Sequence, residues 1–174
     1  MTKPLVGILM GSDSDLEIMK GAASILSELG IENEVLILST HRAPEETAQY
    51  AKEAKAMGIK VIIAGAGGAA ALPGSIAAFT TLPVIGVPIN TKVLKGVDSL
   101  FSIVSMPPGV PVATVGIDSA KNAGLLAAQI IATSDPKISK KFEQYKETIK
   151  KEVLQKNTKI MSSGWEKYLE EKTK

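Results

Sequence analysis

The chain has 174 residues, a formal net charge of +2 at pH 7, no cysteine and only seven aromatic residues. A chain of this length is expected to form one domain, because most domains have about 100–150 residues. The absence of cysteine excludes disulfides, thiolate metal sites and cysteine nucleophiles. The shortage of aromatic side chains favours helices packed on a sheet over an all-β sandwich.

The amino terminus carries no membrane signal. The apolar segment after Pro4 is much too short for a membrane span, and no small-residue cleavage site follows it. A chain without cysteine is also compatible with a reducing compartment. We therefore expect a cytoplasmic protein that makes no contact with membranes.

Apolar segments of strand length alternate along the chain with segments of helical periodicity. The strand-like segments are rich in β-branched residues, which is typical of parallel strands buried on both faces. They cover Leu5–Met10, Glu34–Leu38, Lys60–Ala64, Pro83–Ile89 and Val110–Ile117. Two helices are predicted from Ser12 or Ser14 to Gly30 and from Pro44 to Gly58. Three more are predicted over Pro73–Phe79, Val97–Ser105 and Ser119–Thr133.

Five strands joined by helical crossovers predict a doubly wound parallel sheet with helices on both faces. The predicted fold is α/β, a single three-layer domain of the flavodoxin or Rossmann type over residues 1–134, with an extra carboxy-terminal helix. In such sheets ligands bind beyond the carboxyl ends of the strands. Three unusual loops should meet there: the first loop, GSDSD at 11–15, the second loop, STHRAP at 39–44, and the third loop, GAGGAAALPG at 65–74.

Residues 135–174 are predicted to form a carboxy-terminal extension. They include eleven lysines and seven acidic residues, and an apolar stripe from Ile138 to Val153 keeps a helical spacing of three or four residues. This stripe is too narrow to support a lone helix, so we expect packing on its own domain or on a neighbouring subunit. We interpret the lysines as a solvated helix face rather than a nucleic-acid surface, and we expect partial disorder in the last dozen residues.

The first loop places two hydroxyls and two carboxylates at the start of a helix. Helix capping explains any one of these side chains, and this alternative stays open for each of them. Capping does not need all of them, however. Ser12 and Ser14, with backbone N–H groups at a helix amino terminus, can form an anion site, and Asp15 can accept hydrogen bonds from a ribose diol.

The second loop contains His41, the only histidine, with Arg42 beside it. A lone histidine is often a structural residue hydrogen-bonded to backbone, but this one lies at the predicted ligand edge. Imidazole is the commonest proton shuttle near neutral pH, and the arginine side chain is best shaped to hold a phosphate. We therefore predict that His41 transfers protons and that Arg42 holds an anion.

The third loop formally matches a dinucleotide fingerprint. No acidic residue occurs between Ala54 and Val97, however, so the carboxylate that would bind a ribose is missing. We instead predict that backbone without bulky side chains lines a flat pocket. Such a pocket lets a small ring approach closely and offers N–H groups to an anionic substituent.

Other chemistries fit the sequence less well. A Ser-His-Asp hydrolase built from Ser12 or Ser75, His41 and Asp15 lacks the G-x-S-x-G elbow. A zinc or iron site lacks a second histidine and any cysteine, and no P-loop sequence occurs. No metal site is therefore predicted.

The three loops, MGSDSD, STHRAP and AGAGGAAALPG, are followed by TTLPVIGVPI, GVDSLFSIVSMPPGVPVATVGI and NAGLLAAQII. This combination resembles the PurE family of purine biosynthesis over about Leu5 to Ala132. The third loop is more similar to the microbial class, the N5-carboxyaminoimidazole ribonucleotide mutases, than to the aminoimidazole ribonucleotide carboxylases. The resemblance implies an isomerase that moves a carboxylate from an exocyclic nitrogen to ring carbon four, without a metal or organic cofactor.

The resemblance also implies roles for single residues. Ser12 and Asp15 match positions that bind the ribonucleotide, with the aspartate near the ribose hydroxyls. Ser39 and Arg42 match positions that hold its phosphate, and His41 matches the residue that acts as general acid and then as general base. The backbone of Gly67 and Gly68 is implied to contact the carboxylate or the trapped carbon dioxide. The predicted substrate site also includes Ser14, Ala71 and Leu72.

One position departs from the family pattern. The third loop of the family normally ends GGAAHLPG, with a second histidine where this chain has Ala71. An altered pocket, an engineered change and a paralogue acting on another heteroaromatic acid are all open explanations. An aminoimidazole ribonucleotide carboxylase and a non-catalytic nucleotide-binding module are also open. Family members form octamers whose carboxy-terminal helix reaches over neighbours, so the resemblance implies a homo-octamer that binds a small ribonucleotide and no nucleic acid.

Overall fold

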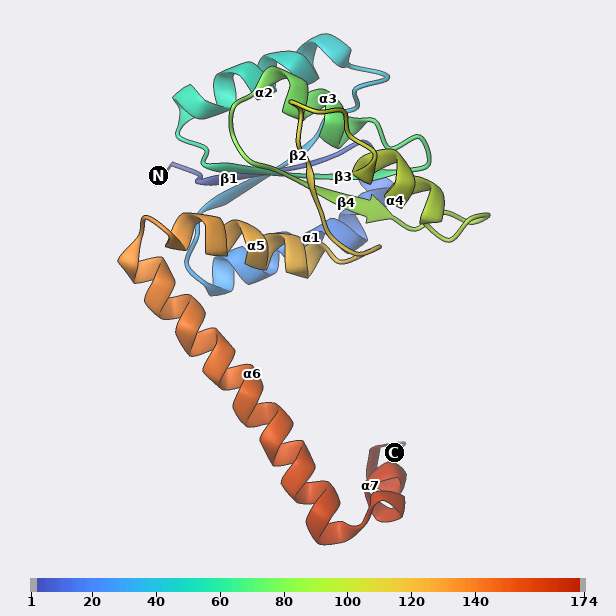
Figure 1. Ribbon diagram of the computed structural model, residues 1–174, viewed down its shortest axis with the longest axis vertical. Helices are drawn as coiled ribbons and strands as arrows, with labels where there is room; N and C mark the ends of the chain where they lie inside the picture. Colours follow the sequence, from blue (N-terminus) through green and yellow to red (C-terminus); the bar gives the residue numbers. More distant parts are fainter. Residues whose placement is uncertain (1–2, 173–174) are drawn as a thin grey trace.

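The computed structural model describes residues 3–172 as an α/β domain followed by a long helical arm (Figure 1). Within these residues five strands form one sheet in the order β2-β1-β3-β4-β5, and every neighbouring pair is parallel. The strands are β1 (Val6–Met10), β2 (Asn33–Ile37), β3 (Val61–Gly67), β4 (Val84–Ile89) and β5 (Ala113–Thr114). The predicted doubly wound α/β fold is confirmed.

Helices cover both faces of the sheet, which gives three layers (Figure 1). On one face lie α1 (Leu16–Glu28), which a 3-10 helix η1 (Asp13–Asp15) precedes, and α5 (Ala120–Ala132). On the other face lie α2 (Pro44–Met57), α3 (Leu72–Phe79) and α4 (Val97–Val104). The arm consists of α6 (Pro136–Ser163) and α7 (Trp165–Lys172).

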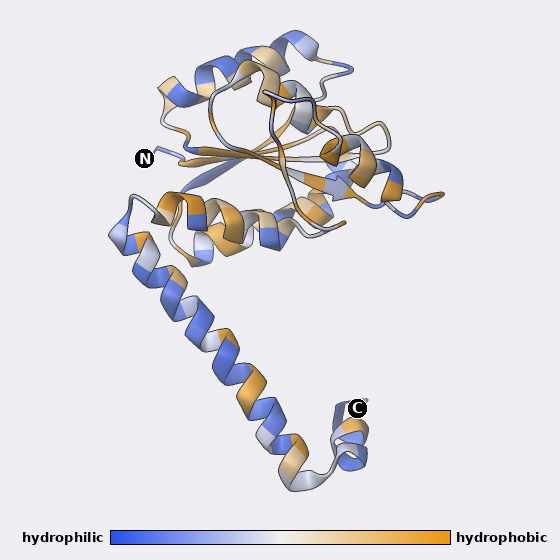
Figure 2. Ribbon diagram, in the orientation of Figure 1, coloured by the Kyte–Doolittle hydropathy of each residue, from blue (hydrophilic) through white to orange (hydrophobic). Residues whose placement is uncertain are grey.

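Each face of the sheet has its own apolar core. Because side chains alternate along a strand, Ile8 and Ile63 pack with α1 and α5, whereas Leu9 and Ile62 pack with α2, α3 and α4. Figure 2 shows the apolar strands enclosed between the two helix layers. Burial on both faces therefore fixes the register of the central strands, and with it the positions of the loops that follow them.

Two strands differ from the sequence prediction. The sequence predicts burial of β2 on both faces, but β2 is an edge strand, and its Val35 and Ile37 are 41% and 55% exposed. The strand predicted over Val110–Ile117 pairs with β4 only at Ala113–Thr114. Pro111 contributes to this shortening because it has no N–H to donate to the sheet.

The arm leaves the domain after Asp135, and only its first turns pack on the domain (Figure 1). Ile138 is buried and Phe142 and Tyr145 pack on the core below α1 and α5, whereas Val153 is 63% exposed. Figure 2 shows the rest of α6 as mostly hydrophilic. Contrary to the predicted partial disorder, the chain forms α7 up to Lys172, and residues 173–174 lie outside the described residues. None of the described helices is long and apolar enough to span a membrane.

Candidate active site

A pocket of about 500 Å³ lies at the carboxyl ends of β1, β2 and β3. These three strands are neighbours and parallel, so the loops after them converge on one edge of the sheet. Nine of the ten predicted site residues line the pocket: Ser12, Ser14, Asp15, Ser39, His41, Arg42, Gly67, Ala71 and Leu72. The tenth, Gly68, does not. Four lining residues were not predicted: Gly11, Thr40, Ala66 and Ala70.

His41 lies in the turn between β2 and α2, and its side chain is exposed to the pocket and to solvent. Within residues 3–172 its imidazole forms no hydrogen bond, so nothing in this range holds it as a structural histidine would be held. An imidazole in this position is free to exchange protons with a bound molecule.

Arg42 connects the first and second loops. Its Nη2 donates to the carbonyl of Gly11 at 2.6 Å, and its Nε donates to Oγ of Ser39 at 3.4 Å. These two bonds use only part of the five N–H donors of a guanidinium, which leaves donors for an anion. The amino terminus of α2, which begins at Pro44 without a side-chain cap, lies two residues away and adds positive potential.

Asp15 is the half-buried carboxylate of the site. Burial raises its pKa above the usual value, while the hydrogen bond from the Ser14 hydroxyl at 3.2 Å and the charge of Arg42 partly oppose this shift. Ser12 does not cap α1. Its Oγ instead accepts from the Ser14 N–H at 3.3 Å and so caps η1. The two serines therefore make local bonds that shape the first loop around Asp15.

The third loop turns sharply as it leaves β3. Gly68 adopts a left-handed backbone conformation (φ +65°), which glycine tolerates. Ala70 also has a positive φ, +42°, which is uncommon for a residue other than glycine. The N–H of Gly68 donates to Oγ of Ser99 at 3.0 Å and so points away from the pocket. Ala71 precedes α3, which has no side-chain cap, so the amino terminus of a second helix faces the pocket.

The pocket thus combines an unbonded imidazole, a guanidinium with spare donors, a half-buried carboxylate and uncapped helix termini. A sequence profile of AIR carboxylases matches residues 5–152, most of the chain and all three loops. The chain belongs to the AIR carboxylase family.

Curated members of the AIR carboxylase family are similar to this chain over almost its whole length. A protein of Thermotoga maritima called N5-carboxyaminoimidazole ribonucleotide mutase is 58% identical over 169 residues, which cover 97% of this chain and 99% of the relative. A mutase of Pyrococcus horikoshii is also 58% identical over 169 residues and 97% of this chain, and covers 96% of that relative. A crystal structure of Treponema denticola PurE has a TM-score of 0.83 at 34% identity, and covers 90% of this chain and 98% of that one.

In this AIR carboxylase family member no group of three or more His, Asp or Glu side chains within residues 3–172 could hold a metal ion. The charged side chains that line the pocket are Arg42 and Asp15, beside the amino termini of two helices. His41 is the only imidazole among the residues that line the described pocket.

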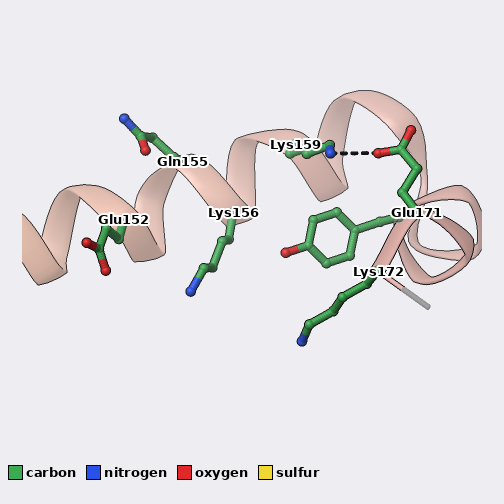
Figure 3. Close-up of a pocket in the computed structure, with 7 residues that line it drawn as sticks. Glu152, Gln155, Lys156, Lys159, Glu171 and Lys172 are labelled. Atoms are coloured by element: carbon green, nitrogen blue, oxygen red, sulfur yellow. Dashed lines mark ion pairs between the residues drawn. The ribbon is translucent and has the colours of Figure 1, made fainter. Parts of the chain in front are cut away.

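A second and larger cavity, of about 580 Å³, lies between α6 and α7. Figure 3 shows its lining side chains, among them the ion pair between Lys159 and Glu171 at 2.6 Å. The ring of Tyr168 lies beside the same lysine. All seven lining residues belong to the arm, far from the sheet edge (Figure 1). We assign no chemistry to this cavity, because most of its lining side chains are solvent-exposed and its ion pair lies at the surface, where such pairs contribute little.

Proposed function

We propose that this chain is an N5-carboxyaminoimidazole ribonucleotide mutase, an isomerase of purine biosynthesis that works without metal or organic cofactor. One observation carries the proposal: the pocket joins His41 to an anion-binding arginine and a glycine-alanine loop, in a chain 58% identical to curated mutases. We also place the protein in the cytoplasm, with a small ribonucleotide as its ligand and no nucleic-acid or membrane partner.

The ribonucleotide binds across the first and second loops. Its phosphate lies at Arg42 and Ser39, where the guanidinium has donors left and the α2 amino terminus adds positive potential. Its ribose hydroxyls donate to Asp15, whose position Ser12 and Ser14 hold through the local bonds around η1. The aminoimidazole ring then lies against the third loop, where Gly67, Ala71 and Leu72 present little side-chain bulk.

His41 acts twice in the reaction. The bond between the exocyclic nitrogen and the carboxylate carbon breaks, its electron pair stays on nitrogen, His41 protonates that nitrogen, and carbon dioxide is released into the pocket. Ring carbon four then attacks the carbon dioxide, and His41 removes the ring proton, which restores its own starting state. The third loop encloses the carbon dioxide, so that neither its escape from the pocket nor its reaction with water competes with the attack by ring carbon four. Since Ala71 carries no imidazole, His41 performs both transfers alone.

Direct carboxylation of aminoimidazole ribonucleotide is the second candidate. It is favoured by relatives called phosphoribosylaminoimidazole carboxylase, such as that of Candida glabrata, which is 54% identical over 170 residues, although this chain covers only 30% of that protein. We expect turnover with N5-carboxyaminoimidazole ribonucleotide and little with aminoimidazole ribonucleotide plus bicarbonate. Activity with the second substrate pair alone would overturn the mutase assignment.

We further propose that residues 135–174 pack on neighbouring copies in a homo-octamer. The support is the apolar surface of α6 that its own domain leaves uncovered: Val153 is 63% and Leu154 is 53% exposed. Light scattering of the full chain should give eight times the monomer mass. Leu154→Glu should lower that mass, whereas the charge change Lys151→Glu in the same turn should not.

A further inference from the structure

Ser99 on α4 is fully buried, and its hydroxyl connects the ends of two neighbouring strands. Its Oγ accepts from the N–H of Gly68 at 3.0 Å and donates to the carbonyl of Ile89 at 2.7 Å. A hydroxyl has one proton to give, so the direction of both bonds is fixed. Ser99 itself does not line the pocket. Figure 1 shows α4 beside the carboxyl end of β4, where this contact occurs.

The Ser99 hydroxyl takes the place of one rung of the sheet. Ile62 N–H donates to the carbonyl of Pro83 at 3.0 Å, and in a parallel ladder this bond recurs at every second residue. By the register of β3 and β4, the next bond in the series after Ala66 would join Gly68 N–H directly to the carbonyl of Ile89. The Ser99 hydroxyl bridges these two groups instead, at the last pair of the β3–β4 register, Gly67 and Ile89.

This bridge lies where the third loop leaves the sheet, directly after the end of β3. β3 ends at Gly67, Gly68 takes its left-handed turn, and Ala70 N–H closes the turn on the carbonyl of Gly67 at 3.2 Å. Gly67, Ala70 and Ala71 then line the pocket. Without the inserted hydroxyl, Gly68 could pair with Ile89 itself, which would pull the start of the loop towards β4.

We propose that Ser99 is a positioning residue of the active site, which holds the third loop in the shape that encloses the reacting carboxyl group. This inference rests on the proposed mutase function. It predicts a specific defect: if the loop moves, carbon dioxide escapes before ring carbon four captures it. Turnovers then end as aminoimidazole ribonucleotide and free carbon dioxide rather than as the carboxylated isomer.

Ser99→Ala tests this role, with Ser102→Ala as the matched control. Ser102 lies one turn later on α4, is exposed, and reaches the carbonyl of Gly68 only at 3.4 Å. For Ser99→Ala we expect kcat to fall about tenfold to a hundredfold, with KM changed much less, because a loop displaced by ~1 Å can cost a hundredfold in rate. The fraction of aminoimidazole ribonucleotide among the products should rise several-fold above the enzyme-free background, and Ser99→Thr, which keeps the hydroxyl, should bring it back towards the original ratio.

The readout separates positioning from plain stability. A variant that is merely less stable loses active enzyme but keeps its product ratio. The proposal is wrong if folded Ser99→Ala gives the same product ratio as the original chain, or if Ser102→Ala changes the ratio as much. If the unaltered chain shows no mutase activity, the proposed function is wrong, and this result does not count against the contacts of Ser99.

Amide exchange on the unaltered chain provides a second test that needs neither activity nor a folded variant. The N–H of Gly68, bonded to a buried hydroxyl, should exchange at least about tenfold more slowly than that of the adjacent exposed Ala69. Equal exchange at the two positions would show that Ser99 does not hold Gly68, and would overturn the proposal.

Discussion

Two cavities within residues 3–172 are similar in size but differ in construction. The pocket at the sheet edge, about 500 Å³, is walled by turns whose positions follow from the register of buried strands. The cavity between α6 and α7, about 580 Å³, is walled by exposed side chains whose lysine and glutamate pair at 2.6 Å. Size alone therefore does not mark a site. Convergent backbone that fixes a few polar groups does.

Replacement of His41 should have the largest effect. His41→Asn keeps a polar side chain of similar size but removes the group that accepts and returns the proton. We expect kcat to fall by about 10²–10⁴, the usual contribution of a general acid-base group. Because His41 has no hydrogen-bond partner within residues 3–172, the melting temperature should not change.

Steady-state kinetics with N5-carboxyaminoimidazole ribonucleotide, beside a thermal melt, measure both quantities. If turnover survives and only binding weakens, His41 is not the proton-transfer residue, and another group in the pocket must be. If the unaltered chain binds the ribonucleotide and never turns it over, the chain is a nucleotide-binding module.

Arg42→Lys should have the next largest effect. Lysine keeps the positive charge but cannot hold a phosphate with two parallel bonds, nor reach Gly11 and Ser39 at the same time. We expect KM to rise about tenfold to a hundredfold, since charge-assisted bidentate bonds are the strong ones. Competition by inorganic phosphate should weaken in parallel. A variant with lower kcat and unchanged KM would show that Arg42 contacts the reacting group instead of the phosphate.

Much of this site is predictable from sequence because topology determines it. Once the apolar segments are assigned to parallel strands, the first three loops must meet at one edge, and nine predicted residues do line one pocket there. The hydrogen bond from Gly68 to Ser99 is not predictable, because Ser99 is 31 positions away in the sequence and is brought close only by the packing of α4. The position of Ala70 in the pocket is also not predictable, since no local signal marks a non-glycine residue with positive φ.

The edges of the fold are less predictable than its centre. Apolar composition does not distinguish a central strand from an edge strand, so the sequence overestimates the burial of Ile37. The stripe along α6 has helical spacing throughout, yet only Ile138, Phe142 and Tyr145 pack on the apolar core of the domain. Where an apolar stripe has no partner in the same chain, sequence spacing cannot say what covers it.

Asp15→Asn should show that the ionised Asp15 carboxylate lowers the stability of the folded chain. Burial raises the pKa of the Asp15 carboxyl, so its ionised form is less favourable in the folded chain than in the unfolded one. Above that raised pKa the wild-type chain bears this cost, and the variant should melt a few degrees higher at most, because solvent screens a half-buried charge. At pH values below the ordinary carboxyl value of 3.8 both chains are neutral here, and the difference should vanish.

The same variant should bind the ribonucleotide more weakly, because an amide accepts fewer hydrogen bonds from the ribose hydroxyls than a carboxylate does. Thermal melts across pH, with titration of the ribonucleotide at neutral pH, measure both effects. Asp13→Asn is the matched control, since this exposed neighbour lies in the same loop but does not line the pocket. A lower melting temperature for Asp15→Asn at neutral pH would contradict the assigned cause of the pKa shift.

Glu171→Gln should have the smallest effect and so sharpens the contrast between the cavities. The change removes the ion pair with Lys159, whose hydrogen bond and charge lower the pKa of the Glu171 carboxyl. Both side chains are solvent-exposed, and exposed ion pairs contribute little to stability. We therefore expect the melting temperature, kcat and KM to match those of the unaltered chain within error. A loss of activity would mean that the arm cavity approaches the active site of a neighbouring copy in the assembled protein, since the sheet edge of the same chain is far away.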